Sequence, residues 1–82
     1  MIKTLNNMDV VITGTLAKMT RARAFEAIRM EGGRPHKKIT GNTDVLVCAI
    51  PPHWVTEKVA FAEQKKINTI TEKEFYFLIG VK

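Results

Sequence analysis

Two uninterrupted apolar runs constrain the fold of this 82-residue chain more than any other feature. Val10, Val11 and Ile12 stand side by side in the first run, and residues 45–49 form the second. A strand with one face in water alternates apolar and polar residues, whereas a strand covered on both faces is apolar throughout. Both runs therefore predict central strands of a sheet that has helices on its two faces.

The segment between the two runs predicts a helix and a short strand. Apolar residues recur at helical spacing between Thr20 and Glu31, and charged residues occupy most of the other positions. Gly32 and Gly33 follow, and glycine readily adopts the left-handed conformation that ends a helix. The polar stretch 34–39 then predicts a strand at the edge of the sheet.

The last third of the sequence predicts a second helix, a fourth strand and a third helix. Apolar residues at positions i, i+4 and i+7 from Val55 predict the helix, and 67–70 predicts the strand. Thr71 and Glu74 match a capping box, in which each side chain satisfies a free backbone amide at the start of a helix. The order βαββαβα implies parallel strands with right-handed crossovers, because helices connect most of them.

Length and charge narrow the class of protein. A usual domain holds roughly 100–150 residues, so this chain has little room for a second core, and we expect one domain over residues 1–82. Thirteen Lys and Arg against eight Asp and Glu leave a net charge of +5, which favours encounter with polyanions such as nucleic acids. The alternative is that this charge serves only solubility.

The sequence offers few residues for disulfide, metal or membrane chemistry. Cys48 is the only cysteine, which excludes an internal disulfide and a cysteine-based metal cluster. His36 and His53 lack the companions that a metal site needs. The first residues lack the apolar stretch of a signal peptide, and nowhere do ~18 consecutive apolar residues occur. We therefore expect a soluble, cytoplasmic protein without a metal or another cofactor.

Several short motifs, taken in their order and spacing, resemble a known family. Residues 10–16 are VVITGTL, the first helix ends in EGGR at 31–34, and TDVLV follows at 43–47. This arrangement resembles BRCT domains, and the version carried by bacterial NAD-dependent DNA ligases looks closest. The resemblance covers about residues 8–80. Lys66 stands where the family pattern has a glycine, and the last helix carries FYF where many members have a tryptophan.

The resemblance implies a BRCT-like α/β fold with a four-stranded parallel sheet in the order 2-1-3-4. The first and third helices would cover one face of the sheet, and the second helix would cover the other. In this order the chain leaves strand one towards one side and strand three towards the other, so a crevice opens at their carboxyl ends. Sheets of this kind usually bind ligands there.

A phosphate site in that crevice is also implied by the resemblance. In family members that bind phosphate, a Ser or Thr hydroxyl, the following glycine amide and a lysine of the second helix hold the oxygens, and this sequence offers Thr13, Gly14 and Lys58. Hydroxyl and amide groups donate hydrogen bonds, and a lysine supplies opposite charge. The alternatives are a Gly14 that only provides an unusual backbone angle, a Thr13 bonded back to the loop, and a Lys58 that is simply solvated.

Cations gather next to this candidate site in the sequence. Lys18, Arg21 and Arg23 crowd the loop and first turn of the first helix, where the helix dipole favours acidic residues. We expect them to contact DNA backbone phosphates, and the alternative is that they are solvated surface residues. Lys37 and Lys38 fall on the predicted edge strand, where they could extend the basic surface, although the favoured role of charged side chains there is to prevent unwanted sheet pairing.

These features favour a non-catalytic DNA-binding module of replication or repair, which recognises a phosphate at a nick or 5′ end without reading base sequence. The alternative is a protein-interaction module that binds a phosphopeptide or a repair partner. No carboxylate pair, nucleophile with a base or nucleotide-binding glycine loop is present, so we do not expect an enzyme. The resemblance also suggests a bacterial or phage protein associated with the nucleoid. Trp54 could stack on a base, although covering the core is its favoured role.

Overall fold

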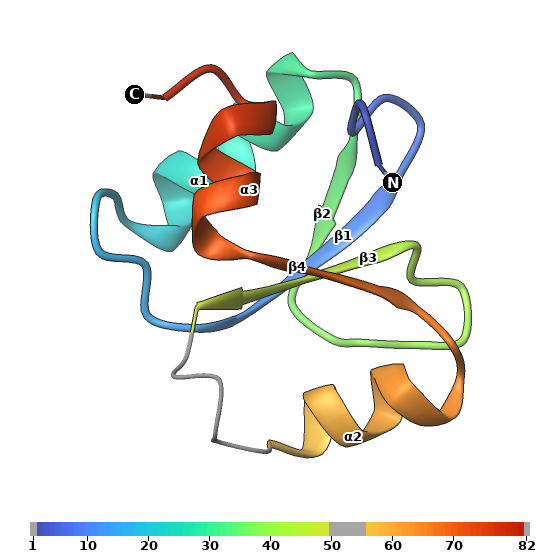
Figure 1. Ribbon diagram of the computed structural model, residues 1–82. Helices are drawn as coiled ribbons and strands as arrows, with labels where there is room; N and C mark the ends of the chain where they lie inside the picture. Colours follow the sequence, from blue (N-terminus) through green and yellow to red (C-terminus); the bar gives the residue numbers. More distant parts are fainter. Residues whose placement is uncertain (1, 50–55, 82) are drawn as a thin grey trace.

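The computed structural model describes residues 2–49 and 56–81, so the expectations for Trp54 and for the start of the second helix at Val55 lie outside the described residues. Helices and strands follow one another in the predicted order (Figure 1). Their bounds are β1 (Asp9–Gly14), α1 (Arg21–Met30), β2 (Arg34–His36), β3 (Val45–Ala49), α2 (Glu57–Gln64), β4 (Asn68–Thr71) and α3 (Glu72–Leu78).

The four strands form one parallel sheet in the order β2-β1-β3-β4, which confirms the predicted topology. β1 is central and pairs with β3 from Val10 opposite Val45 to Gly14 opposite Ala49. β2 pairs only with the first half of β1 and carries Pro35, whose missing amide is tolerated on an edge strand.

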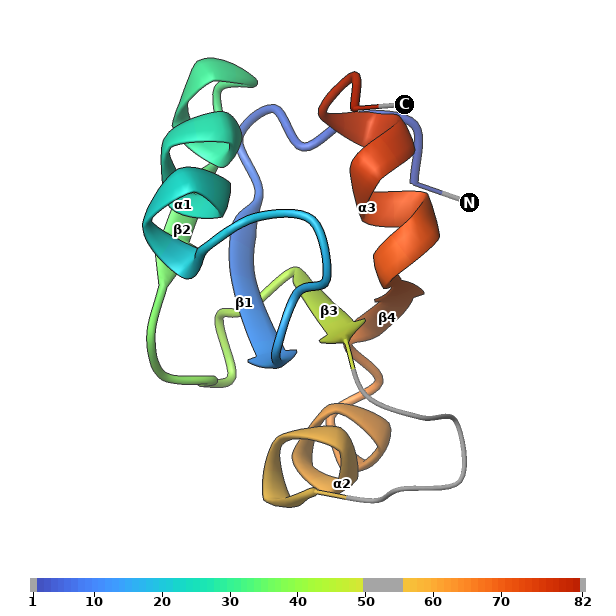
Figure 2. The ribbon, with the colours of Figure 1, turned by 90° about the vertical axis from the view of Figure 1, so that its left-hand side faces the viewer.

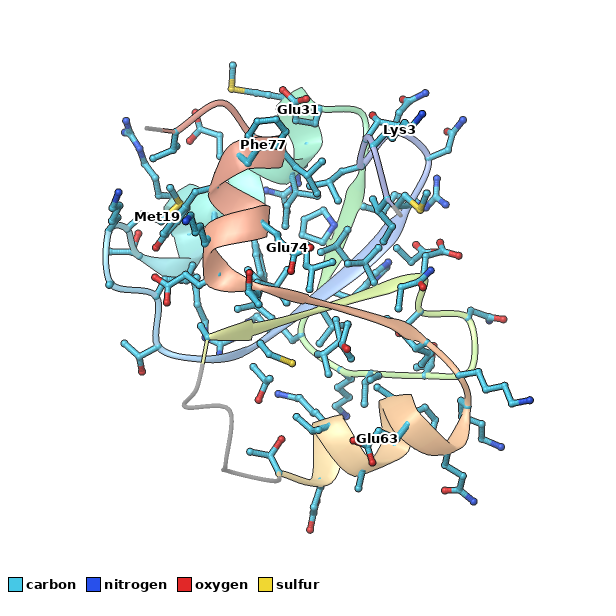
Figure 3. All side chains as sticks on the ribbon, viewed as in Figure 1. Lys3, Met19, Glu31, Glu63, Glu74 and Phe77 are labelled. Atoms are coloured by element: carbon cyan, nitrogen blue, oxygen red, sulfur yellow. The ribbon has the colours of Figure 1, made fainter. Side chains whose placement is uncertain are left out.

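Both faces of β1 and β3 are covered, which explains why these strands are apolar throughout. Val10 and Ile12 belong to a large core cluster with residues of α1 and α3. Val11 belongs to a smaller cluster, which it forms with Leu46 of β3 and Ala62 of α2. Successive strand residues point to opposite faces, so the two clusters lie on opposite sides of the sheet. Figure 2 shows α1 and α3 on one side and α2 on the other, and Figure 3 marks these sides with Glu74 and Glu63.

The described helices begin in the same way, with a threonine cap. The hydroxyls of Thr20, Thr56 and Thr71 accept hydrogen bonds from backbone amides in the first turns of α1, α2 and α3. The capping box of Thr71 and Glu74 is complete, as predicted. Each cap replaces an intrahelical partner that the first amides of a helix lack.

Left-handed residues end these helices. Gly32 has φ 83°, and the amide of Gly33 returns to the Ile28 carbonyl at 2.9 Å, which confirms the predicted glycine stop after α1. Gly80 plays the same part after α3 with φ 79°. After α2 the left-handed position is held by Lys66 with φ 57°, where the family pattern has a glycine.

β2 is shorter than the prediction of a strand over 34–39, which was wrong at its end. The strand stops at His36, and the chain bends at Lys37 and Lys38. Ile39 then packs against the smaller core cluster beneath α2. Packing of the partly buried Ile39 against this cluster is consistent with the early end of the strand, and Lys37 and Lys38 lie beyond it.

The core extends towards the N-terminus beyond the stretch that carries the resemblance. Leu5 is fully buried in the larger cluster, and Ile2 packs against it. A side chain at Gly33 would stand 2.8 Å from the Leu5 carbonyl oxygen, so this glycine permits the close approach of the two segments. The segment before β1 is thereby fastened over the end of α1.

Candidate functional site

The candidate site lies at the edge of the sheet where β1 and β3 end. Thr13 and Gly14 close β1, Cys48 and Ala49 close β3, and α2 begins beyond β3 in the chain. The arrowheads of β1 and β3 point towards the end of the molecule that carries α2 (Figure 2). This is the switch point predicted from the strand order.

Thr13 is nearly buried, with 5% of its surface exposed. It follows Ile12 on the strand, so it lies on the same face as Val11 and α2, opposite Cys48 of β3. Burial raises the pKa of the Cys48 thiol, so this neighbour is uncharged at neutral pH.

Arg21 is fastened to the end of β1. Its guanidinium donates hydrogen bonds to the carbonyl oxygens of Ile12 at 2.8 Å and Gly14 at 2.9 Å. Gly14 itself has φ 90°, a left-handed conformation that favours glycine. Because a guanidinium has five N–H donors, these two bonds leave others for a ligand, and they fix a positive charge beside Gly14.

Lys18 lies in a loop that rests on α3. The backbone amide of Ala17 donates to Glu72 Oε2 at 2.6 Å, and that of Lys18 donates to the Tyr76 hydroxyl at 3.0 Å. The Tyr76 hydroxyl in turn donates to Glu72 at 2.5 Å, and Lys18 Nζ stands 5.5 Å from the centre of the Tyr76 ring. Burial, with help from the hydrogen bond to Glu72, raises the pKa of Tyr76. Figure 2 shows this loop arching between α1 and α3.

The three cations that we expect to contact DNA backbone phosphates therefore lie in different surroundings. Arg21 joins Gly14 at the end of β1, Lys18 lies against Tyr76, and Arg23 is exposed on the first turn of α1. The Arg23 amide donates to the cap Thr20 at 3.2 Å, which involves its backbone only.

Lys58 lies on the first turn of α2, at the same edge of the sheet as Thr13 and Gly14. It is half-buried and lines an open groove of about 400 Å³. The groove lies between α2 and the segment that follows β2, and its residues are Lys37, Lys38, Ile39, Glu57, Lys58 and Phe61. Within the described residues no hydrogen bond joins Lys58 to Thr13 or Gly14, so a ligand would have to bridge them.

A polar cluster at the opposite edge of the sheet was missed by the sequence analysis. Asp9 Oδ1 stands 2.8 Å from both Arg34 Nε and His36 Nε2, and the Asp9 amide donates to Asp44 at 2.8 Å. Hydrogen bonds from Arg34 and then His36 lower the pKa of Asp9 to about 2. The β1–β2 register, in which His36 lies opposite Val11, creates this cluster, and no local motif reveals that register.

Neither a metal centre nor a membrane span is found in residues 2–49 and 56–81. In these ranges His, Cys, Asp and Glu do not gather in a group of three or more that could hold a metal ion. No helix in the same ranges has the length and apolar character required to cross a membrane.

Sequence comparison relates the chain to DNA ligases. It is 36% identical over 75 residues to a DNA ligase of Aquifex aeolicus and 40% identical over 70 residues to one of Roseiflexus castenholzii. A DNA ligase of Bifidobacterium animalis subsp. lactis is 35% identical over 78 residues. These matches cover 92%, 85% and 95% of the chain but only 9–10% of each ligase, so the chain spans about a tenth of their length. No family model matches the chain.

Structural comparison relates the fold to a solved BRCT structure. The crystal structure of the BRCT1,2 region of Rad4 in complex with a Crb2 phosphopeptide matches 95% of this chain with a TM-score of 0.76 at 20% sequence identity. The match covers 41% of that longer chain. The strand order, the placement of the helices and the sequence relatives therefore lead to one conclusion: the chain has the BRCT fold and is homologous to a segment of DNA ligases.

Proposed function

We propose that this chain acts as a single non-catalytic binding domain that recognises a terminal phosphate of DNA, at a nick or a 5′ end. In this proposal the Thr13 hydroxyl and the Gly14 amide donate to the phosphate oxygens, and Lys58 supplies charge from α2. The relatives are DNA ligases, which makes DNA the favoured ligand. The net charge of +5 supports the same choice.

The observation that carries the proposal is the fixed position of the Arg21 guanidinium. Its bonds to the Ile12 and Gly14 carbonyls hold a permanent positive charge at the end of β1, beside a left-handed glycine. A preplaced charge needs no rearrangement when an anion arrives, and its remaining N–H groups suit phosphate oxygens. We therefore propose Arg21 as a member of the phosphate site, with Lys18 and Arg23 contacting the flanking backbone.

A matched pair of lysines allows a sharp test. Lys58 and Lys73 each occupy the second position of a helix and follow a glutamate, but they lie on opposite sides of the sheet. We expect a labelled duplex with a 5′ phosphate to bind more tightly than the same duplex without it. In the variant Lys58→Ala, the ratio of the affinities for the two duplexes should fall about tenfold, as expected when one charged hydrogen bond is removed. Lys73→Ala should keep the ratio of the natural chain.

Fluorescence anisotropy at two salt concentrations would measure these affinities. Binding to the unphosphorylated duplex should weaken as salt rises and should survive in Lys58→Ala, because backbone contacts do not depend on the terminal phosphate. Equal binding of the two duplexes by the natural chain would contradict the proposal.

A phosphopeptide is the second candidate ligand, and one observation favours it. The Rad4 BRCT structure that matches this fold holds a phosphopeptide. Tight binding of a phosphoserine peptide, together with no salt-dependent binding of DNA, would favour this function over the first. The same Lys58→Ala variant tests whether either ligand uses the candidate site.

A further inference from the structure

A basic groove adjoins the candidate phosphate site and shares Lys58 with it. Lys37 and Lys38 reach it from the bend after β2, and Lys58 reaches it from α2. Among the described residues that line it, Glu57 is the one carboxylate, against three lysines. The groove therefore carries an excess of positive charge.

Within the residues that the structure describes, these three lysines form no ion pair. Within the described parts of the chain, the recorded ion pairs join Asp9 to Arg34 and His36, and none includes Lys37, Lys38 or Lys58. Like charges that share a groove repel one another, and an internal carboxylate partner would relieve that repulsion. A bound polyanion would relieve it as well.

Apolar side chains also line the groove, which suits a chain of phosphates and sugars. Ile39 and Phe61 line it, and both are only partly buried. Lysine side chains lay their apolar stems along such surfaces and direct the ammonium group to the ligand. Apolar sugar faces alternate with charged phosphates along a nucleic-acid strand, which matches a groove lined by both apolar and basic side chains.

We propose that this groove, made of Lys37, Lys38, Ile39, Lys58 and Phe61, holds the backbone of the DNA strand that leads away from the bound terminal phosphate. This inference rests on the proposed function, because Lys58 belongs to both the site and the groove. It adds a path for this strand along α2 and the bend after β2. The lysines bind as point charges, so the groove discriminates neither bases nor their order.

The test uses two double variants with the same loss of charge. Lys37→Ala combined with Lys38→Ala removes two groove lysines, whereas Lys3→Ala combined with Lys73→Ala removes two exposed lysines from other parts of the surface. Both should keep the thermal unfolding midpoint of the natural chain. The groove variant should bind DNA with and without a 5′ phosphate about tenfold more weakly at low salt, and its salt slope should fall by about 2. The control variant should change neither quantity to this extent.

The outcomes separate this inference from the proposed function. A natural chain that prefers the phosphorylated duplex, with the groove variant binding as tightly as the control, would overturn the groove and leave the phosphate site standing. Loss of binding in the groove variant without any phosphate preference in the natural chain would keep the groove and overturn the site. Binding of a phosphoserine peptide but not of DNA would overturn both.

Lysine methylation gives a second readout that needs no variant. Bound DNA should protect Lys37, Lys38 and Lys58 from reductive methylation, as measured by mass spectrometry, and should leave Lys73 reactive. Equal reactivity of all four lysines with and without saturating DNA would contradict the path along the groove.

Discussion

At the scale of single residues, backbone conformation identifies a position that is not optimal for stability. Lys66 adopts φ 57° after α2, where Gly32 and Gly80 fill the corresponding positions after α1 and α3. A side chain with a Cβ is crowded in the left-handed region, at a cost of roughly 1–2 kcal/mol. The structure therefore gives a physical meaning to the departure from the family pattern at this position.

We expect Lys66→Gly to stabilise the chain by about 0.5–1 kcal/mol, because glycine removes this strain but costs entropy in the unfolded state. For a chain of this size the unfolding midpoint should rise by a few degrees. Thermal unfolding followed by circular dichroism measures this change. Ala60→Gly, at an exposed position in the interior of α2, should lower the midpoint instead, and equal effects of the two variants would contradict the assignment.

At the scale of elements, ion pairs connect β1 to β2 near the amino end of β1. Asp9 of β1 binds Arg34 and His36 of β2, and its amide is held by Asp44, which precedes β3. The lowered pKa of Asp9 means that its charged form is favoured by folding. This contribution to stability is present above the usual pKa of 3.8 and is lost as the pH falls towards about 2.

We expect Asp9→Asn to reduce the free energy of unfolding at pH 6 and to have little effect near pH 2, where Asp9 is becoming protonated. Urea unfolding at pH 6, 4 and 2 gives the difference between the natural chain and the variant. A matched Asp44→Asn variant, whose carboxyl forms no recorded ion pair in the described structure, separates the charge effect from the amide hydrogen bond. A difference that grows towards pH 2 would contradict the role of Asp9.

The elements themselves could be predicted from the sequence, whereas several of their contacts could not. Helices and strands follow local periodicity and local caps, such as Thr71 with Glu74, and the resemblance supplied the strand order. The end of β2 accompanies packing of Ile39 against the cluster beneath α2, and the Arg21 bonds depend on how α1 approaches the end of β1. The contact of Ala17 with Glu72 joins residues 55 positions apart, and no local pattern reports it.

At the scale of the whole molecule, the two layers of the core differ in size. The buried cluster beneath α1 and α3 is the larger, and the buried cluster beneath α2 holds only Val11, Leu46 and Ala62 among the described residues. Small domains bury a limited share of their surface, so single core residues carry much of the stability. Leu5 is the clearest case, because it is fully buried and lies before β1.

We expect Leu5→Ala to cost about 2–5 kcal/mol through lost burial and a new cavity. Total stabilities of about 0.05–0.15 kcal/mol per residue make this a large share for 82 residues. Leu5→Met should cost less than about 1.5 kcal/mol, because volume is conserved. Denaturant unfolding measures both, and an effect of Leu5→Ala as small as that of Lys3→Ala would contradict a structural role for this segment.

The attachment of the 15–20 loop to Glu72 and Tyr76 has a consequence for the order in which the protein matures during synthesis. The loop borders the candidate phosphate site, yet its anchors come from the last helix of the chain. Synthesis delivers β1 and α1 before α3, so the loop between them lacks its anchors until Glu72 and Tyr76 have left the ribosome. The candidate binding edge is therefore completed only after the segment that carries α3 has emerged.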